Sequence, residues 1–347
     1  MKRLKFTVRV ESADKFKRLT KDIADSAITL LVVPSGVYFI HFDSQLYILK
    51  RLVMINSEPI PNPVAIRILK SDFLNLLIDG TLEFIIEDGE LRLGYYNEKG
   101  KKLYGYNLTF QEDLLENYID KINLFSELNT YPSIDFNGAK PIVRMAKSLG
   151  VPVCCDGQVI HLNAGALFVY QEFSGLRFTV NSKYLGLIID HSNIVHSVRE
   201  YLVMKSGDIV IAVHKLQDVG DSDYDSIKSK GSSHRITLDM SDLIFLAKKV
   251  KVTKGDFIFD MYRRKAKFIS GTSVFIADLD IKDVKRVKYK DNPLKSIPIP
   301  TLKIPGAVFK SVFANFKAGT EVIINIKKDF VEVRYSNLII VFSKEVV

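Results

Sequence analysis

The chain has 347 residues, of which 47% are hydrophobic and 26% charged, and its formal net charge is +9. This composition is ordinary for a soluble globular protein, and the length predicts two or three domains. No apolar run reaches the roughly 20 residues that span a bilayer, and the opening residues lack the apolar core of a signal peptide. We therefore expect a soluble, cytoplasmic protein whose positive charge either suits a polyanionic partner or serves solubility alone.

The predicted elements repeat one pattern six times along the chain. A short β-branched strand leads into a polar start, an amphipathic helix of roughly ten residues and two or three strands of alternating polarity. The helices are expected to begin near Ala13, Lys70, Ala139, Asn181, Ser241 and Gly306. One such unit cannot bury its own apolar face, so neighbouring units must pack together. The spacing is too irregular for a solenoid, and we group the units into three similar domains of two units each, an α+β architecture.

Long polar or basic stretches separate or interrupt the expected domains. Gln111–Tyr131 is interpreted as a connector with a short helical turn, and Gln217–Ser233 as a linker because it is rich in Asp, Ser, Lys and Gly. A basic, proline-bearing bridge, Lys285–Pro300, precedes the sixth unit. The predicted domains cover residues 1–125, 126–230 and 231–347.

Several of the predicted helices carry a basic face. In the third helix, Ile142 is expected to face a sheet, whereas Lys140, Arg144 and Lys147 recur on another face, and Gly150 suits a C-cap. For one helix, a solvated face is a sufficient explanation. Recurrence in several helices instead predicts a positive lining that contacts a phosphate backbone without reading sequence. The basic residues of this predicted lining are Lys15, Lys17, Arg18, Lys21, Lys70, Lys140, Arg144, Lys147, Lys183, Lys248, Lys251, Lys254, Lys310 and Lys317.

The sequence contains none of the common catalytic or cofactor motifs. There is no P-loop, no Gly-rich dinucleotide turn, no paired-His zinc motif and no nucleophile elbow. Asp221, Asp223 and Asp225 resemble the start of a calcium loop, but the glycine and glutamate that such a loop needs do not follow. The adjacent Cys154 and Cys155 fit neither zinc spacing nor a disulfide framework. We predict a protein that is not an enzyme, with no catalytic residue, no metal and no cofactor.

Three local phrases, together with the six-unit architecture, make the chain resemble the DNA sliding clamps. They are Gly36–Asp43 (GVYFIHFD), Ser71–Leu77 (SDFLNLL) and Asp221–Tyr224 (DSDY). The resemblance covers nearly the whole chain and rests on architecture more than on a sharp motif. Three domains per chain is similar to the bacterial β clamp, which closes as a head-to-tail homodimer. The resemblance implies a DNA-clamp fold whose helices line the interior of a ring. The weak match to bacterial clamps suggests a viral or otherwise divergent member of the family.

The resemblance also implies a pocket that takes a short apolar peptide of a polymerase or clamp loader. By position, its residues are Gly165, Ala166, Leu167, Phe168, Tyr224, Val346 and Val347. Ala166 and Leu167 stand where bacterial clamps have a His-Arg pair, so the resemblance does not carry the partner specificity over to this chain. A competing interpretation is that Leu167 and Phe168 belong to a strand core.

The leading hypothesis is therefore a sliding clamp that encircles double-stranded DNA without sequence preference and tethers a DNA polymerase to it. It would act as a processivity factor in DNA replication, in the cytoplasm of a bacterial or virus-infected cell and associated with the nucleoid. One alternative is a monomeric clamp-fold processivity factor that holds DNA on one basic face. Another is a clamp-like scaffold that recruits a transcription complex.

Overall fold

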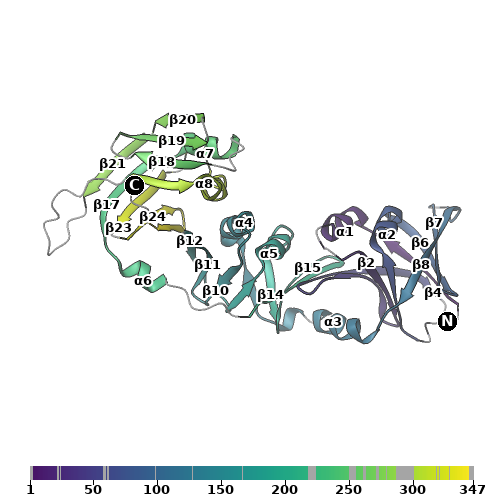
Figure 1. The fold of residues 1–347 in the computed structure, drawn as a ribbon. Coiled ribbons are helices and arrows are strands. Elements are labelled where there is room, and N and C mark those ends of the chain that lie inside the picture. Colours follow the sequence, from purple (N-terminus) through teal and green to yellow (C-terminus); the bar gives the residue numbers. More distant parts are fainter. Residues whose placement is uncertain are drawn as a thin grey trace. The chain divides into compact units, whose positions relative to one another are not determined.

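The chain forms two compact units (Figure 1). A computed structural model describes the chain apart from residues 1–2, 22, 24, 58–59, 61, 98, 127, 166, 218–223, 250–254, 261–262, 271–272, 279, 287–300, 318, 320, 328 and 344–347. Unit 1 comprises Met1–Phe136 and Leu187–Lys215, and unit 2 comprises Asn137–Gly186 and Leu216–Val347. The three predicted domains stay a prediction.

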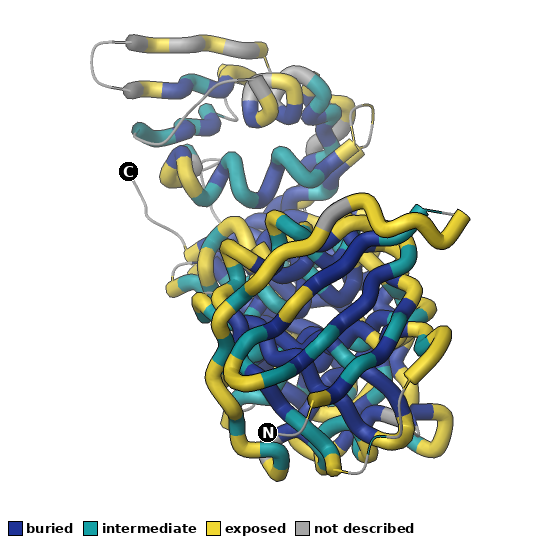
Figure 2. Tube along the Cα trace, turned by 90° about the vertical axis from the view of Figure 1, so that its right-hand side faces the viewer, coloured by how far each residue is buried: buried dark blue, intermediate teal, exposed yellow. Residues whose placement is uncertain are grey.

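The first part of unit 1 is a row of strands that closes on itself. Its elements are β1 (Leu4–Val10), α1 (Ala13–Thr20), β2 (Ala27–Val33), β3 (Gly36–Phe42), β4 (Leu46–Ser57), β5 (Val64–Leu69), α2 (Lys70–Leu76), β6 (Gly80–Glu87), β7 (Glu90–Tyr96) and β8 (Lys102–Glu112). The strand order is β1-β6-β7-β8-β5-β2-β3-β4, and β1 also pairs with β4. Figure 2 shows the buried residues of this part gathered inside the strands and the exposed residues outside.

The rest of unit 1 extends the same sheet from β4. Its elements are α3 (Glu116–Ser126), the short 3₁₀ helix η1 (Leu128–Thr130), β9 (Ser133–Asp135), β14 (Ile194–Val198), β15 (Tyr201–Ser206) and β16 (Ile209–His214). The order β4-β16-β15-β14-β9 continues the hydrogen-bonded ladder without a break. Strands that are far apart in sequence therefore belong to one sheet.

Strand β3 is buried on both faces because its side chains alternate between two cores. On one face, the Phe39 ring lies 5.8 Å from Phe16 of α1 and 4.7 Å from Phe73 of α2. On the other face, Ile40 belongs to a cluster that includes Tyr118 of α3. The sheet thus lies between the α1–α2 layer and α3.

Helix α3 is longer than the sequence analysis indicated for the connector. It has 11 residues, and its Tyr118, Ile122 and Phe125 recur at helical spacing and pack into the core of unit 1. The polar residues between them conceal this apolar stripe in the sequence. The connector therefore contains a full helix where a short helical turn was expected.

Unit 2 holds the remaining strands in two sheets. Its elements are η2 (Asn137–Ala139), α4 (Lys140–Leu149), β10 (Val153–Cys155), β11 (Val159–Ala164), β12 (Leu167–Glu172), β13 (Phe178–Val180), α6 (Tyr224–Ser229), β17 (Ser232–Asp239), α7 (Ser241–Lys249), β18 (Asp256–Asp260), β19 (Lys265–Ser270), β20 (Ser273–Asp278), β21 (Asp280–Arg286), β22 (Leu302–Pro305), α8 (Gly306–Phe313), β23 (Glu321–Lys327), β24 (Phe330–Tyr335) and β25 (Leu338–Ser343), and α5 (Ser182–Ile189) spans the boundary between the units. One sheet has the order β13-β10-β11-β12-β25-β24-β23-β17-β21 and the other β20-β19-β18-β22.

Helix α8 is the packing centre of unit 2. It contacts both α4 and α7. Its Phe309 ring stacks 3.6 Å from that of Phe257 in β18, and Phe313 lies over Phe342 of β25. Helix α4 ends as the sequence predicts, because Gly150 takes a left-handed conformation with φ of 69° and its N–H donates to the last turn.

A buried carboxylate in β24 binds three polar side chains of unit 2. Glu332 is fully buried, accepts a hydrogen bond from Asn325 Nδ2 at 2.8 Å, and pairs with the Lys327 ammonium at 2.8 Å. The guanidinium of Arg334 also donates to Glu332. Burial raises the pKa of Glu332, but the contacts with Arg334, Lys327 and Asn325 outweigh that effect and hold the pKa below its ordinary value of 4.5.

We expect Glu332→Gln to lower the free energy of unfolding by about 3 kcal/mol at neutral pH, because Lys327 would be left buried without its counter-charge. A lowered folded-state pKa stabilises the protein above the unfolded-state pKa, and this stabilisation is lost as the pH falls through the folded value. The difference between wild type and variant in urea titrations should therefore shrink below a pH of about 4.5.

The matched control is Glu321→Gln, which removes an exposed ion pair with Lys282. It should cost less than about 1 kcal/mol. Equal losses in the two variants, or a pH-independent loss in Glu332→Gln, would contradict the role assigned to the buried carboxylate.

Candidate nucleic-acid and peptide interfaces

Helix α4 presents the clearest basic face. Ile142, Val143, Met145 and Ala146 are buried, whereas Arg144 and Lys147 are exposed and Lys140 is half-buried. The spacing of Lys140, Arg144 and Lys147 places them along one side of the helix, and α4 contains no acidic residue. Pro141 occupies the first turn, where its missing N–H costs nothing.

The basic side of α4 approaches the part of α5 that belongs to unit 2. A Cβ at Gly186 would lie 3.2 Å from Lys147 Cδ, so the glycine lets the aliphatic stem of this lysine lie across α5. Lys183 is exposed, and its ammonium lies 5.4 Å from the centre of the Tyr184 ring. Two of the predicted basic helices thus contribute to one local surface.

The predicted lysines of α7 and α8 and of the residues after α8 differ in how exposed they are. Lys248 is exposed, and its Nζ donates to the Phe316 carbonyl oxygen at 3.0 Å, just beyond the end of α8. Lys310 is half-buried and Lys317 is exposed. The predicted residues Lys251 and Lys254 lie outside the described part of the chain.

Helices α1 and α2 of unit 1 lie on the same side of their sheet (Figure 1). Arg18 and Lys21 are exposed, and Lys17 is half-buried. Lys15 donates to Ser206 Oγ at 3.1 Å, and Lys70 donates to the Ile23 carbonyl oxygen at 2.7 Å. Lys15, Lys70 and Lys248 therefore make structural contacts in addition to the role predicted for them.

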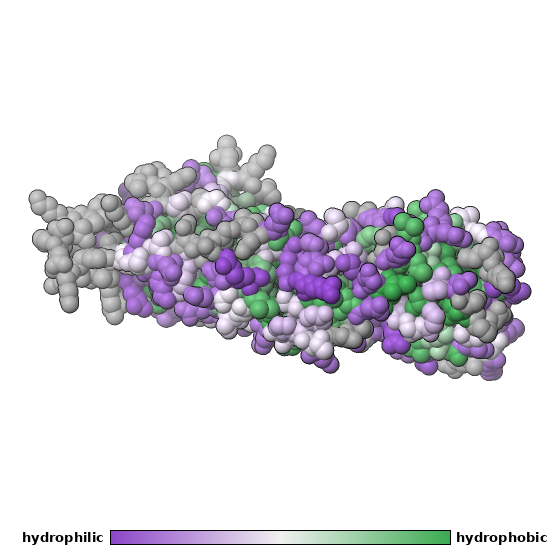
Figure 3. Space-filling view, turned by 90° about the horizontal axis from the view of Figure 1, so that it is seen from below, coloured by the Kyte–Doolittle hydropathy of each residue, from purple (hydrophilic) through white to green (hydrophobic). Residues whose placement is uncertain are grey.

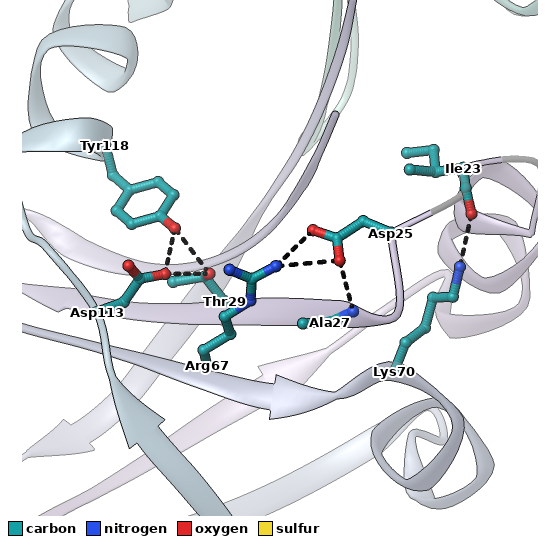
Figure 4. Close-up of polar contacts among 8 residues, drawn as sticks. All are labelled: Ile23, Asp25, Ala27, Thr29, Arg67, Lys70, Asp113 and Tyr118. Atoms are coloured by element: carbon teal, nitrogen blue, oxygen red, sulfur yellow. Dashed lines mark hydrogen bonds and ion pairs between the residues drawn. The ribbon is translucent and has the colours of Figure 1, made fainter. Parts of the chain in front are cut away.

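Figure 4 shows the hydrogen bond of Lys70 to Ile23 and other polar contacts of β2, β5 and α3. The Arg67 guanidinium donates to both oxygens of Asp25, at 3.0 and 2.9 Å. Farther along the same strands, Thr29 donates to Tyr118 of α3 at 3.1 Å. These contacts join the chain after α1 and the start of α2 to strands β2 and β5, and they join α3 to β2. They therefore help to hold α1 and α2 in place.

The predicted peptide pocket is only partly assembled. Phe168 and Tyr170 share one face of β12, with their rings 5.6 Å apart, and Tyr224 of α6 meets Tyr170 edge-on at 4.9 Å. Tyr224 also contacts Glu172 and Lys228 through its hydroxyl group. Phe168 and Tyr224 therefore lie in one aromatic cluster with Tyr170, and its role as a peptide pocket stays a prediction.

Leu167 lies on the opposite face of β12. It pairs with Phe342, whose ring contacts α8, and it is almost fully buried. Its position agrees with the interpretation as strand core. Gly165 forms the turn before β12 with φ of 69°. Ala166, Val346 and Val347 lie outside the described residues.

The sequence analysis did not identify His161, which lies beside this cluster. Its ring is buried and 5.5 Å from Phe168. Burial lowers the pKa of His161, which favours the neutral ring. Within the described residues, neither ring nitrogen has a hydrogen-bond partner. Only the strand register brings His161 to Phe168, and no sequence motif indicates it.

The comparisons with known proteins identify the fold. No protein-family model matches the chain, and no curated protein matches its sequence. The solved DNA polymerase III β subunit of Thermotoga maritima is similar, with a TM-score of 0.65 and 12% identity over 98% of both chains. A putative β subunit from Eubacterium rectale gives 0.68 and 13%, over 98% of this chain and 99% of that one.

This chain has the DNA-clamp fold. The expected α+β class and the resemblance to bacterial β clamps are thereby confirmed, over almost the entire length. A Helicobacter pylori β clamp bound to a DNA ligase peptide is also similar, with a TM-score of 0.63 and 12% identity over 99% of both chains. At such identities the likeness establishes the clamp fold and assigns no residue its role.

Among the described residues, no cluster of three or more His, Cys, Asp or Glu side chains could hold a metal ion. No helix in the same part of the chain is long and apolar enough to cross a membrane.

Proposed function

We propose that this protein is a sliding clamp that encircles double-stranded DNA and tethers a DNA polymerase to it. The observation that carries the proposal is the exposed basic side of α4 on a DNA-clamp fold. Lysine and arginine bind phosphates without reading bases, and many weak, exchangeable contacts of this kind permit sliding. The protein acts as a scaffold and needs no catalytic group.

The aromatic cluster of Phe168, Tyr170 and Tyr224 supports a second element of the proposal, a docking site for short peptides of the polymerase and the clamp loader. Aromatic side chains are favoured anchors for peptide recognition. The Helicobacter pylori clamp was solved with a DNA ligase peptide. In this chain, His161 adds a buried polar group beside Phe168.

Exposed apolar residues on two strands support a homodimer. Strand β20 is an edge of its sheet, and its Val274 and Ile276 are 54% and 59% exposed. Strand β8 lies between β7 and β5, but its residues 102–109 pair with β7 alone, and this part exposes Leu103 and Tyr106. Unpaired apolar strand edges invite pairing with another chain, and a head-to-tail contact between two such surfaces closes into a ring.

We expect the triple variant Lys140→Glu, Arg144→Glu and Lys147→Glu to bind a fluorescent short duplex at least about tenfold more weakly at low salt. The slope of log affinity against log salt should become shallower by about 2 to 3, as up to three phosphate contacts are lost. Fluorescence anisotropy measures both quantities, and circular dichroism checks that the variant is folded.

The control is Lys99→Glu, Arg199→Glu and Arg264→Glu, which makes the same change of charge at three exposed residues in turns between strands. It should keep most of the affinity. A triple α4 variant that binds like the wild type, or a control that loses as much affinity, would argue against a DNA-contacting face on α4.

We also expect wild-type protein to have a mass near twice 39.4 kDa in light scattering coupled to size exclusion. Val274→Glu combined with Ile276→Glu should give the monomer mass, because charges would replace the apolar edge of β20. Phe245→Glu, which alters an exposed apolar residue of α7, should leave the dimer intact. A wild-type monomer at every concentration would favour the alternative of an open, monomeric processivity factor.

A further inference from the structure

The outer face of β4 in unit 1 carries an apolar–basic–apolar row. Leu49, Arg51 and Val53 alternate along the strand and therefore point to the same side. Leu49 lies in the core beneath α3, Arg51 is exposed, and Val53 is 58% exposed. A single exposed apolar residue is ordinary on a protein surface, so recognition is inferred from the pockets beside Arg51 and Val53.

Two adjoining pockets follow this row. The first, of about 220 Å³, lies between α3 and the sheet and is lined by the apolar side chains of Tyr38, Leu49, Ile122, Phe125 and Val210. A cavity of about 150 Å³ accommodates benzene, so this pocket has room for an aromatic or leucine side chain. Figure 3, seen from the side on which α3 is drawn in Figure 1, shows apolar surface over unit 1.

The second pocket, of about 470 Å³, continues past the β2–β3 turn. Pro34, Gly36, Leu52, Val53 and Met54 contribute to its lining. Arg51 and Asp208 line both pockets, so they stand at the junction. We call the two pockets together the β4 groove, because they share these two charged lining residues.

The charge at the junction of the two pockets is positive. Asp208 pairs with the ammonium of Lys50, a lysine whose side chain is fully buried, so its charge is already compensated. Lys205 also lines the first pocket and is exposed. Among the residues that the structure describes, neither Arg51 nor Lys205 has a carboxylate partner. The groove therefore offers two apolar recesses separated by an uncompensated cation.

We propose that the β4 groove docks a short acidic segment of a partner protein in an extended conformation. One apolar side chain enters each pocket, and a carboxylate between them pairs with Arg51. A strand rises about 3.3 Å per residue, which puts Leu49 and Val53 about 13 Å apart. In an extended ligand, the two apolar anchors are then four residues apart, with the acidic residue midway. This site lies in unit 1 and uses no residue of the predicted peptide pocket.

The test is selection of random short peptides on the full-length protein, followed by anisotropy with the most enriched peptide carrying a fluorophore. The expected sequences have two apolar residues four positions apart and Asp or Glu midway. Arg51→Glu and Val53→Asp, both changes at exposed side chains, should each weaken binding at least about tenfold, or about 1.4 kcal/mol. Lys99→Glu, the charge-matched control in the β7–β8 turn, should leave binding unchanged.

A charge exchange sharpens the test. Replacing the acidic residue of the peptide by lysine should abolish binding to wild type and restore it to Arg51→Glu. Tyr224→Ala, which alters the other candidate pocket, should have no effect. The proposal would be overturned if no such pattern is enriched, or if Arg51→Glu binds the acidic peptide as well as wild type. A change of oligomeric mass in Val53→Asp would overturn it too, because a second copy of the chain would then occupy the groove.

Discussion

Burial of β3 on both faces of its sheet is the constraint on which the other features of unit 1 depend. In β3, Phe39 packs beneath α1 and α2, while the next residue, Ile40, packs beneath α3. A sheet of this kind needs a layer on each side, so the connecting segments cannot be free loops. Helix α3 covers the outer face in unit 1, and in unit 2 α6 contributes Tyr224 to the outer cluster around Tyr170. In α4 one side of the helix stays uncovered, and Arg144 and Lys147 are exposed there.

The placement of charge follows from the same constraint. Charges inside the protein are paired, as in Lys50 with Asp208 and Lys327 with Glu332, because an unpaired buried charge is very costly. Charges on the uncovered side of α4 have no acidic residue on their own helix. A face that only needed solubility could carry both signs, whereas a phosphate-contacting face gains from one sign. The β4 groove is the outer-face counterpart, where a cation lies between apolar recesses.

The repeat of strand, helix and strands predicted the α+β class, because hydrophobic periodicity and turn residues such as Gly150 are local signals. The resemblance to the sliding clamps implied the fold itself. The predicted length of helix α3 was too short, because polar residues separate Tyr118, Ile122 and Phe125 in the sequence. These three residues are recognised as one apolar stripe only when the sheet against which they pack is known. Leu167 and Phe168 adjoin in sequence but lie on opposite faces of β12, which positional analogy alone does not reveal. His161 and the β4 groove depend on strand pairing across distant parts of the chain. Such long-range register is not encoded in any short motif.

Topological retention on DNA tests the central claim most directly. Linear duplex with terminal biotins would be incubated with the protein while its ends are free, then blocked with streptavidin and washed at moderate salt. In a second sample, the ends would be blocked before the protein is added. A closed ring threads over free ends and is then trapped, so the account predicts retention only in the first order of addition. Equal retention in both orders would mean that the protein holds DNA by surface contact, and would contradict an encircling clamp.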